Sequence, residues 1–159
     1  MGDPTLHVVL VEPEIHWNTG NAGRTCLGLG AQLHLVEPLG FGLDDREVRR
    51  AGLDYWPRVK PRLWPTLSAL EQALPGLGEP FFFTPEATRT LWSVRFPERA
   101  VLLFGRESVG FAPDVRARQA EHLVSIPMGD PALRSLNVST AVGIAGYEWL
   151  RQRHPARSS

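Results

Sequence analysis

Residues 126–148, with the sequence IPMGDPALRSLNVSTAVGIAGYE, combine a long loop with an unusual helix. The loop is rich in Gly, Pro, Ser and Asn and follows a short apolar run, which predicts a strand before it. From Val138 on, apolar residues recur at the spacing of one helical stripe (Val138, Ala141, Val142, Ala145 and Trp149). A long loop beside a buried strand commonly carries function. This stretch therefore predicts a functional loop followed by a helix.

The predicted helix contains small residues where a stable helix would avoid them. Gly143 and Gly146 each cost about 1 kcal/mol relative to alanine inside a helix. Such a cost indicates that another part of the protein approaches this backbone closely. At the helix start, Ser135 and Asn137 suit two interpretations equally, a helix cap and a contact with a polar ligand.

The overall composition indicates one domain over residues 1–159, with a flexible tail from about residue 152. The chain is 43% hydrophobic and long enough to bury a core. It contains neither an apolar run of membrane-spanning length nor a signal-peptide pattern, so we expect a cytoplasmic protein without membrane contact. A single cysteine, Cys26, excludes an internal disulfide.

The charged residues give a mixed signal about nucleic acid. The formal net charge is zero, which argues against binding by bulk electrostatics. However, Lys60 is the only lysine, whereas arginine, the side chain suited to bidentate phosphate contacts, is abundant. A codon bias of the source genome explains the same excess. Local arginine clusters, such as Arg46, Arg49 and Arg50, still suit a basic surface.

Alternating strand and helix patterns predict the fold class. Apolar runs predict strands at residues 6–11, 32–36, 80–84, 100–104 and 122–126. Helical patterns follow at residues 44–50 and 113–119, from Thr66 to about Leu74, and from a cap at Asn18 or Thr19 to Leu29, with Gly30 as the stop. Residues 54–57 and 64–65 are predicted as loops. This order favours an α/β fold, with a mostly parallel sheet and helices on both faces.

Three motifs stand at the ends of predicted strands. They are NTGNAGR at residues 18–24, FGRESVG at 104–110, and IPM followed by SLNVSTA between 126 and 141. The carboxyl ends of parallel strands are where open α/β sheets bind ligands. Arg24 opposes the positive end of its helix dipole, which suggests a purpose other than helix stability. The five histidines lack metal-ligand spacing, and no nucleotide-binding glycine motif is present.

In this order and at this spacing, the three motifs resemble the 2′-O-ribose methyltransferases of the SPOUT (α/β-knot) superfamily. The segments VEPEIHWNTGN, GFGLDDREVRRAGLDYW and GYEWLRQR look like its small TrmL (YibK-like) branch, which methylates the wobble nucleotide of certain leucine tRNAs. The resemblance covers nearly the whole chain. It implies a deep C-terminal trefoil knot, S-adenosylmethionine bound in that knot, no metal, and a homodimer that completes the site.

The resemblance also implies roles for residues at matching positions. Cofactor contacts fall on Phe83, Thr84, Gly105, Ile126, Ser135 and Leu136. The family's arginine, proposed to help activate the 2′-hydroxyl, matches Arg24. Because a guanidinium hardly deprotonates, we expect Arg24 instead to bind the phosphate next to the reacting ribose and to stabilise the emerging alkoxide. Asn18, Glu107 and Asn137 would fix Arg24 and the loops by hydrogen bonds. Dimer and tRNA contacts fall on Tyr147, Arg46 and Arg50.

The implied activity is S-adenosylmethionine-dependent 2′-O-methylation of the wobble cytidine or modified uridine of tRNA. Two alternatives stay open: a SPOUT methyltransferase with another target, either rRNA or a different tRNA position, and a non-enzymatic RNA-binding or assembly module. Two features depart from the branch. The loop at residues 129–134 is one residue longer, and Trp17 stands where proline is common. Both affect substrate fit.

Overall fold

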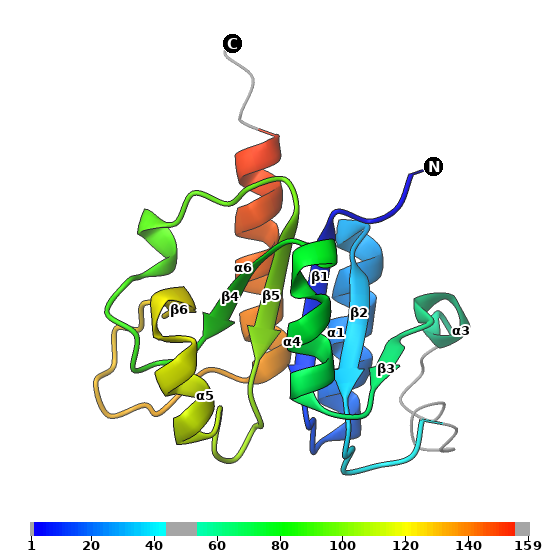
Figure 1. Cartoon of the computed structure of the whole chain (residues 1–159), viewed down its shortest axis with the longest axis horizontal. Coiled ribbons are helices and arrows are strands. Elements are labelled where there is room, and N and C mark those ends of the chain that lie inside the picture. Colours follow the sequence, from blue (N-terminus) through cyan, green and yellow to red (C-terminus); the bar gives the residue numbers. More distant parts are fainter. Residues whose placement is uncertain (1, 44–53, 155–159) are drawn as a thin grey trace.

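The computed structural model describes residues 2–43 and 54–154. Within these ranges one six-stranded sheet has the order β3-β2-β1-β5-β4-β6, and all its strand pairs are parallel (Figure 1). The strands are β1 (Leu6–Val11), β2 (Gln32–Val36), β3 (Arg62–Trp64), β4 (Glu79–Phe83), β5 (Ala100–Phe104) and β6 (Leu123–Val124). The predicted parallel α/β sheet is therefore confirmed.

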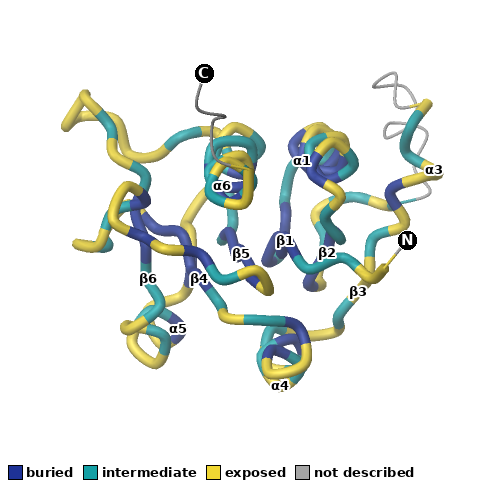
Figure 2. Tube along the Cα trace, turned by 90° about the horizontal axis from the view of Figure 1, so that it is seen from above, coloured by how far each residue is buried: buried dark blue, intermediate teal, exposed yellow. Residues whose placement is uncertain are grey.

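Helices cover both faces of the sheet, as predicted. Figure 2 shows α1 (His16–Leu29), α3 (Trp56–Val59) and α6 (Val138–Arg153) on one side, and α4 (Leu67–Leu77) and α5 (Pro113–Arg118) on the other. Two short 3-10 helices, Leu91–Ser93 and Ala120–His122, complete the described elements. None of the helices described is both long and apolar enough to span a membrane.

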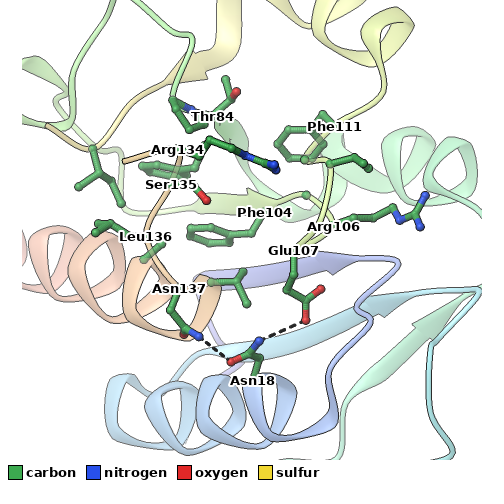
Figure 3. A pocket seen from close by; sticks show the side chains of 18 of the residues that line it. Asn18, Thr84, Phe104, Arg106, Glu107, Phe111, Arg134, Ser135, Leu136 and Asn137 are labelled. Atoms are coloured by element: carbon green, nitrogen blue, oxygen red, sulfur yellow. Dashed lines mark hydrogen bonds between the residues drawn. The ribbon is translucent and has the colours of Figure 1, made fainter. Parts of the chain in front are cut away.

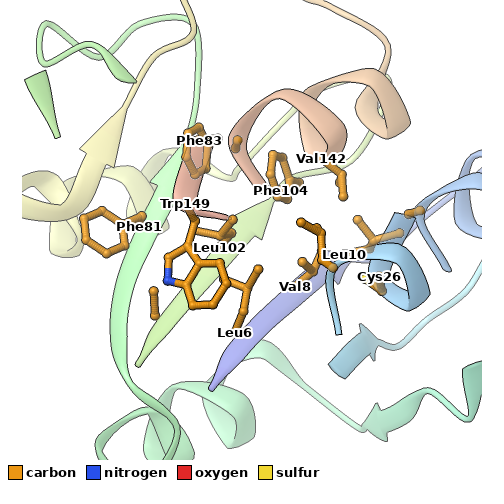
Figure 4. Close-up of a cluster of buried hydrophobic side chains, with 14 of the residues drawn as sticks. Leu6, Val8, Leu10, Cys26, Phe81, Phe83, Leu102, Phe104, Val142 and Trp149 are labelled. Carbon is orange, nitrogen blue, oxygen red and sulfur yellow. The ribbon is translucent and has the colours of Figure 1, made fainter. Parts of the chain in front are cut away.

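The strand β5 lies in the middle of the sheet because all five of its residues are apolar. It pairs with β1 on one side and β4 on the other, and every one of its side chains is buried. Figure 4 shows the core between the sheet and α1 and α6, where the Trp149 ring packs among side chains of β1, β4 and β5. A β-carbon on Gly146 would overlap the side chain of Leu29, so the predicted close approach to α6 is found at the contact with α1.

The start of α1 differs from the prediction. The helix begins at His16, and its N-cap residue, Ile15, has no side-chain cap hydrogen bond. Asn18 and Thr19, predicted as caps, are buried inside the helix. The carboxylate of Glu107, from the loop after β5, accepts the backbone N–H of Ile15 at 3.0 Å, so a distant residue replaces the local cap. The predicted stop is correct, because Gly30 adopts the left-handed conformation.

Several other boundaries need correction. The predicted loops around residues 54–57 and 64–65 contain parts of α3 and the edge strand β3, which are too short for a periodic pattern. The helix α6 continues to Arg153, and the side chain of Gln152 bonds to Val94 and Phe96. Residues 155–159 of the expected tail lie outside the described residues. The helix predicted at residues 44–50 lies outside the described residues.

Three neighbouring strands share a row of polar rings, in which His7 and His34 are buried and Trp64 is partly buried. The indole N–H of Trp64 donates to Nδ1 of His34 at 2.9 Å, and Nε2 of His34 lies 2.9 Å from Nδ1 of His7. Because Trp64 can only donate, His34 must carry its proton on Nε2 and donate to His7. Burial, the charge of His7 and that of Arg62 together lower the pKa of His34 from 6.5 to about 3. The pKa of His7 is also lowered, chiefly by burial.

Because of these two histidines, we expect the stability of the folded protein to decrease in acid. Their pKa values are lower in the folded than in the unfolded chain, so the unfolded chain binds protons first, and stability present above pH 6.5 is lost on acidification. We expect the free energy of unfolding to fall by up to about 1.4 kcal/mol per pH unit for each histidine. The lowered pKa values of Glu14 and Glu71 add a loss only below 4.5. Urea unfolding between pH 6.5 and 4.5 measures the effect.

A matched pair of variants tests which histidine causes the slope of the free energy of unfolding against pH. His34→Gln keeps one donor and one acceptor but cannot titrate, so it should reduce the slope and leave the share that comes from His7. His154→Gln removes an exposed histidine and should leave the slope unchanged. Equal slopes in the two variants would contradict the assignment.

Candidate active site

A pocket of about 440 Å³ opens at the carboxyl ends of four adjacent strands (Figure 3). Because the sheet is parallel, the loops after β1, β5, β4 and β6 meet at this edge. Its lining residues are Ile15 and Asn18 after β1, Phe104 to Glu107 and Val109 to Phe111 at β5, Phe83 to Glu86 at β4, and Ile126, Met128, Arg134 to Val138 and Ala141 after β6. The three sequence motifs thus contribute to one pocket.

All six residues implied as cofactor contacts line this pocket (Phe83, Thr84, Gly105, Ile126, Ser135 and Leu136). Its floor is aromatic, because the rings of Phe83 and Phe104 stack with centroids 5.0 Å apart and planes at 9°. Polar groups lie on the wall beside it, where the hydroxyl of Thr84 donates to the carboxylate of Glu86. The pocket therefore offers a flat apolar surface next to hydrogen-bonding groups.

Asn18 connects the three loops through both ends of its amide. Its Nδ2 donates to Glu107 at 3.3 Å, and its Oδ1 accepts from Nδ2 of Asn137 at 2.9 Å. Asn137 is also the N-cap of α6, because its Oδ1 accepts the backbone N–H groups of Ser139 and Thr140. The bonds expected between the loops are thus present, and of the two interpretations of Asn137 the helix cap is found.

Asn18→Asp should destabilise the protein. The change removes the donor to Glu107 and places a second carboxylate beside it at a buried position. An unsatisfied buried polar group costs about 1–3 kcal/mol, which in a chain of this size lowers the melting temperature by several degrees, at about 2–4 °C per kcal/mol. Asn21→Asp, exposed on the same helix, is the matched control, and similar melting of both variants would contradict the role of Asn18.

Glu14 and Ser108 hold the same loops together but were not predicted from the sequence. Glu14 Oε1 accepts the backbone N–H of Ser108 at 2.9 Å and its hydroxyl at 2.8 Å, while Glu107 accepts the backbone N–H of Glu14 at 2.9 Å. The Ser108 bonds, with help from Arg106, lower the pKa of Glu14. Arg134 donates to the carbonyl of Ser108 at 2.6 Å, so the loop after β6 joins this network. Glu14 lies within VEPEIHW, but its partner is 94 residues away.

Arg24 lies outside the pocket of its own chain. It is exposed on α1, and its guanidinium lies 5.6 Å from the ring centre of Tyr55, whose hydroxyl donates to the carbonyl of Gly20. Tyr147 is half-exposed on α6, and a β-carbon on Gly28 would lie 3.0 Å from its hydroxyl. Hence the structure brings Asn18, Glu107 and Asn137 together at the pocket but not Arg24 or Tyr147.

Two further predictions concern basic residues and metals. Arg46 and Arg50, predicted to contact tRNA or the dimer partner, lie outside the described residues. Among the residues described, no group of three His, Cys, Asp or Glu side chains is arranged to hold a metal ion.

Two relatives share the name of one enzyme and match this chain over nearly their full length. The tRNA (cytidine(34)-2′-O)-methyltransferase of Burkholderia pseudomallei (strain 1106a) is 45% identical over 156 residues, covering 92% of this chain and 95% of the relative. A protein of the same name from Polaromonas sp. is 42% identical over 162 residues, covering 95% and 96%.

Solved structures agree in fold. One that concerns the 2-OH methylation of C/U34 on tRNA matches with a TM-score of 0.87 at 46% identity, covering 96% of this chain and 98% of that chain. The SpoU methyltransferase AviRb from Streptomyces viridochromogenes, solved in complex with AdoMet, matches with a TM-score of 0.79 at 24% identity, covering 99% and 61%. The likeness to AviRb concerns the fold alone.

The family model described as SpoU rRNA Methylase matches residues 5–147, which include all three motifs. The resemblance inferred from the sequence is therefore confirmed, and the chain belongs to the SpoU rRNA methylase family.

Proposed function

We propose that this protein transfers a methyl group from S-adenosylmethionine to the ribose 2′-hydroxyl of the wobble nucleotide, nucleotide 34, of tRNA. The substrates are leucine isoacceptors with cytidine or a modified uridine at that position. The observation that carries the proposal is the convergence of the three family motifs on one pocket. High identity over nearly the full length of relatives named for this reaction supports the choice of substrate.

The pocket residues fit S-adenosylmethionine. The volume of the pocket lies within the usual range of small-molecule sites, about 300–1,000 Å³. The stacked rings of Phe83 and Phe104 suit a heteroaromatic base, and Thr84, Glu86 and Ser135 supply partners for hydroxyl and amino groups. The lining carries two carboxylates, Glu86 and Glu107, and two guanidinium groups, Arg106 and Arg134, so groups of both charges are available to the ammonium and the carboxylate of the ligand.

Methyl transfer requires the protein to align the ribose 2′-hydroxyl with the methyl group and to stabilise the alkoxide that develops. When bound, the cofactor supplies a methyl group on a positively charged sulfur, which a correctly aligned oxygen accepts without a metal. The pocket loops hold that alignment, which is the main source of rate in such a transfer. Arg24 binds the phosphate next to the ribose and stabilises the developing alkoxide, and the hydroxyl proton leaves to that phosphate or to water. A guanidinium does not act as the base, because it hardly deprotonates.

A homodimer would bring Arg24 to a pocket. The guanidinium lies outside the pocket of its own chain, on an exposed stripe of α1. Nearby, α6 packs along α1, and a β-carbon on Gly143 would contact nothing within 4 Å of its own chain. We propose that these two helices pair with a second copy, so that Arg24 of one subunit serves the pocket of the other. Arg46, Arg50 and Tyr147 are proposed to contact tRNA or the partner.

Two further properties belong to this proposal. The C-terminal segment, from the loop at residues 126–137 into α6, passes through a loop of the chain to form the trefoil knot, and the protein acts on tRNA in the cytoplasm. The close contact between Gly146 and Leu29 supports tight packing of this segment.

Methyl transfer from labelled S-adenosylmethionine to total RNA of a strain lacking the gene tests the proposal. Nuclease mapping should place the label on the wobble ribose of leucine tRNAs. Label in rRNA or at another tRNA position would replace the substrate but keep the enzyme class. Absence of label, with no cofactor binding by calorimetry, would instead indicate an RNA-binding or assembly module.

A further inference from the structure

Trp17 exposes a large aromatic ring in the first turns of α1. It is 55% exposed, although its neighbours Asn18 and Thr19 are buried. The His16 ring meets it edge-on with centroids 4.8 Å apart, and the Phe41 ring in turn meets the His16 ring edge-on at 6.4 Å. Ring contacts thus support the indole. An exposed aromatic ring that is already fixed loses little conformational entropy when a flat partner stacks on it.

Trp17 lies in the first turn of α1, which borders the pocket. Ile15 and Asn18, on either side of it in the sequence, both line the pocket. Val109, which also lines the pocket, and Leu133, next to the lining residue Arg134, are likewise exposed and apolar. The start of α1 and the loops after β5 and β6 therefore each carry an exposed apolar side chain at, or next in sequence to, residues that line the pocket.

The exposed face of α1 that carries Trp17 also carries the guanidinium of Arg24. Trp17, Asn21, Arg24 and Gly28 follow the spacing i, i+4, i+7 and i+11, and all four are exposed. Arg24 lies two turns beyond Trp17, about 10 Å along the helix axis. The stripe thus pairs an aromatic surface with a guanidinium. This pairing suits a single-stranded nucleic acid, whose bases stack on aromatic rings while its phosphates bind arginine.

We propose that Trp17 is a base-stacking residue for the RNA substrate, with its indole face taking an unpaired base next to the methylated ribose. The inference rests on the proposed function and adds to it a residue that positions the substrate. Trp17 does not touch the reacting atoms. Its contribution is to hold the RNA loop so that the target ribose enters the pocket next to Trp17, where Arg24 of the partner subunit acts in the proposed dimer.

Steady-state kinetics and direct binding to a synthetic anticodon stem-loop test this role. Trp17→Ala should raise both the KM and the Kd for RNA roughly tenfold, with unchanged kcat and unchanged affinity for S-adenosylmethionine. Trp17→Phe should recover most of the affinity, because a phenyl ring still stacks. RNA should quench tryptophan fluorescence less in Trp17→Phe than in the wild type. Trp92→Ala, which removes a 65% exposed tryptophan outside the pocket lining, is the matched control.

The outcomes separate the inference from the proposed function. Unchanged RNA affinity in Trp17→Ala would overturn the inference, and so would dissociation of a wild-type dimer in that variant, since Trp17 would then be a subunit contact. A wild-type protein that binds RNA through Trp17 but transfers no methyl group would refute the proposed function and leave the stacking role intact.

Discussion

Arg24→Ala is expected to lower the rate of methyl transfer by roughly a hundredfold or more, the usual effect of removing a group that stabilises developing negative charge. Binding of S-adenosylmethionine should stay unchanged, because Arg24 is not among the residues that line the pocket. Single-turnover kinetics and calorimetry measure the two quantities. Arg118→Ala is a suitable control, since Arg118 pairs with Glu71 on the opposite face of the sheet. Loss of cofactor affinity in Arg24→Ala would refute its assignment to the RNA side.

Subunit mixing shows whether Arg24 acts across a dimer. One inactive variant, Arg24→Ala, keeps an intact pocket, and a second, Gly105→Ala, is expected to have a defective pocket but an intact Arg24. Random exchange makes half of the dimers mixed, and each mixed dimer regains one of two sites, so about a quarter of the wild-type activity should return. If Arg24 serves its own pocket, no activity returns.

Gly105→Ala is expected to weaken binding of S-adenosylmethionine at least tenfold, or by about 1.4 kcal/mol. A β-carbon at residue 105 would lie 2.5 Å from the carbonyl carbon of Gly110 and 2.6 Å from the nitrogen of Phe111. Both are backbone atoms of the loop that forms one wall of the pocket, and Arg106 and Gly110 are bonded to each other there in both directions. Even one methyl group must therefore push this wall out of place.

Calorimetry on Gly105→Ala and on a matched variant tests this expectation. Gly129→Ala lies in another pocket loop, where an added β-carbon would meet nothing within 4 Å, so it should bind the cofactor like the wild type. Thermal melting shows whether each variant is folded at the assay temperature. A folded Gly105→Ala protein with wild-type affinity would contradict the account of the pocket wall.

The parts of the fold that could be predicted are those that local sequence determines. The limits of β1 and β2 were correct because apolar runs end at turn residues, and Thr66 caps α4 as predicted, by accepting the N–H of Ala69. The edge strand β3 was missed because three residues between two prolines carry no periodicity. The helix start at His16 was missed because its partner, Glu107, is 92 residues from Ile15.

In the candidate site, too, some features could be predicted from local sequence and others could not. Motifs at strand ends identified the pocket walls, since parallel strands bring their carboxyl ends to one edge. The pairing of Glu14 with Ser108 could not be predicted, because it joins two loops far apart in the sequence. Neither could the row of His7, His34 and Trp64, because those residues resemble ordinary strand positions until the strand order is known. The position of Arg24 outside the pocket is likewise a property of the folded chain.

Two synthetic anticodon stem-loops that differ by one oxygen atom test the central claim most directly. One carries ribose at nucleotide 34, and the other carries 2′-deoxyribose there. Incubation with labelled S-adenosylmethionine and the wild-type protein should label the first RNA, at nucleotide 34, and leave the second unlabelled, because it lacks the nucleophile. Equal labelling of both RNAs would contradict methylation of this hydroxyl.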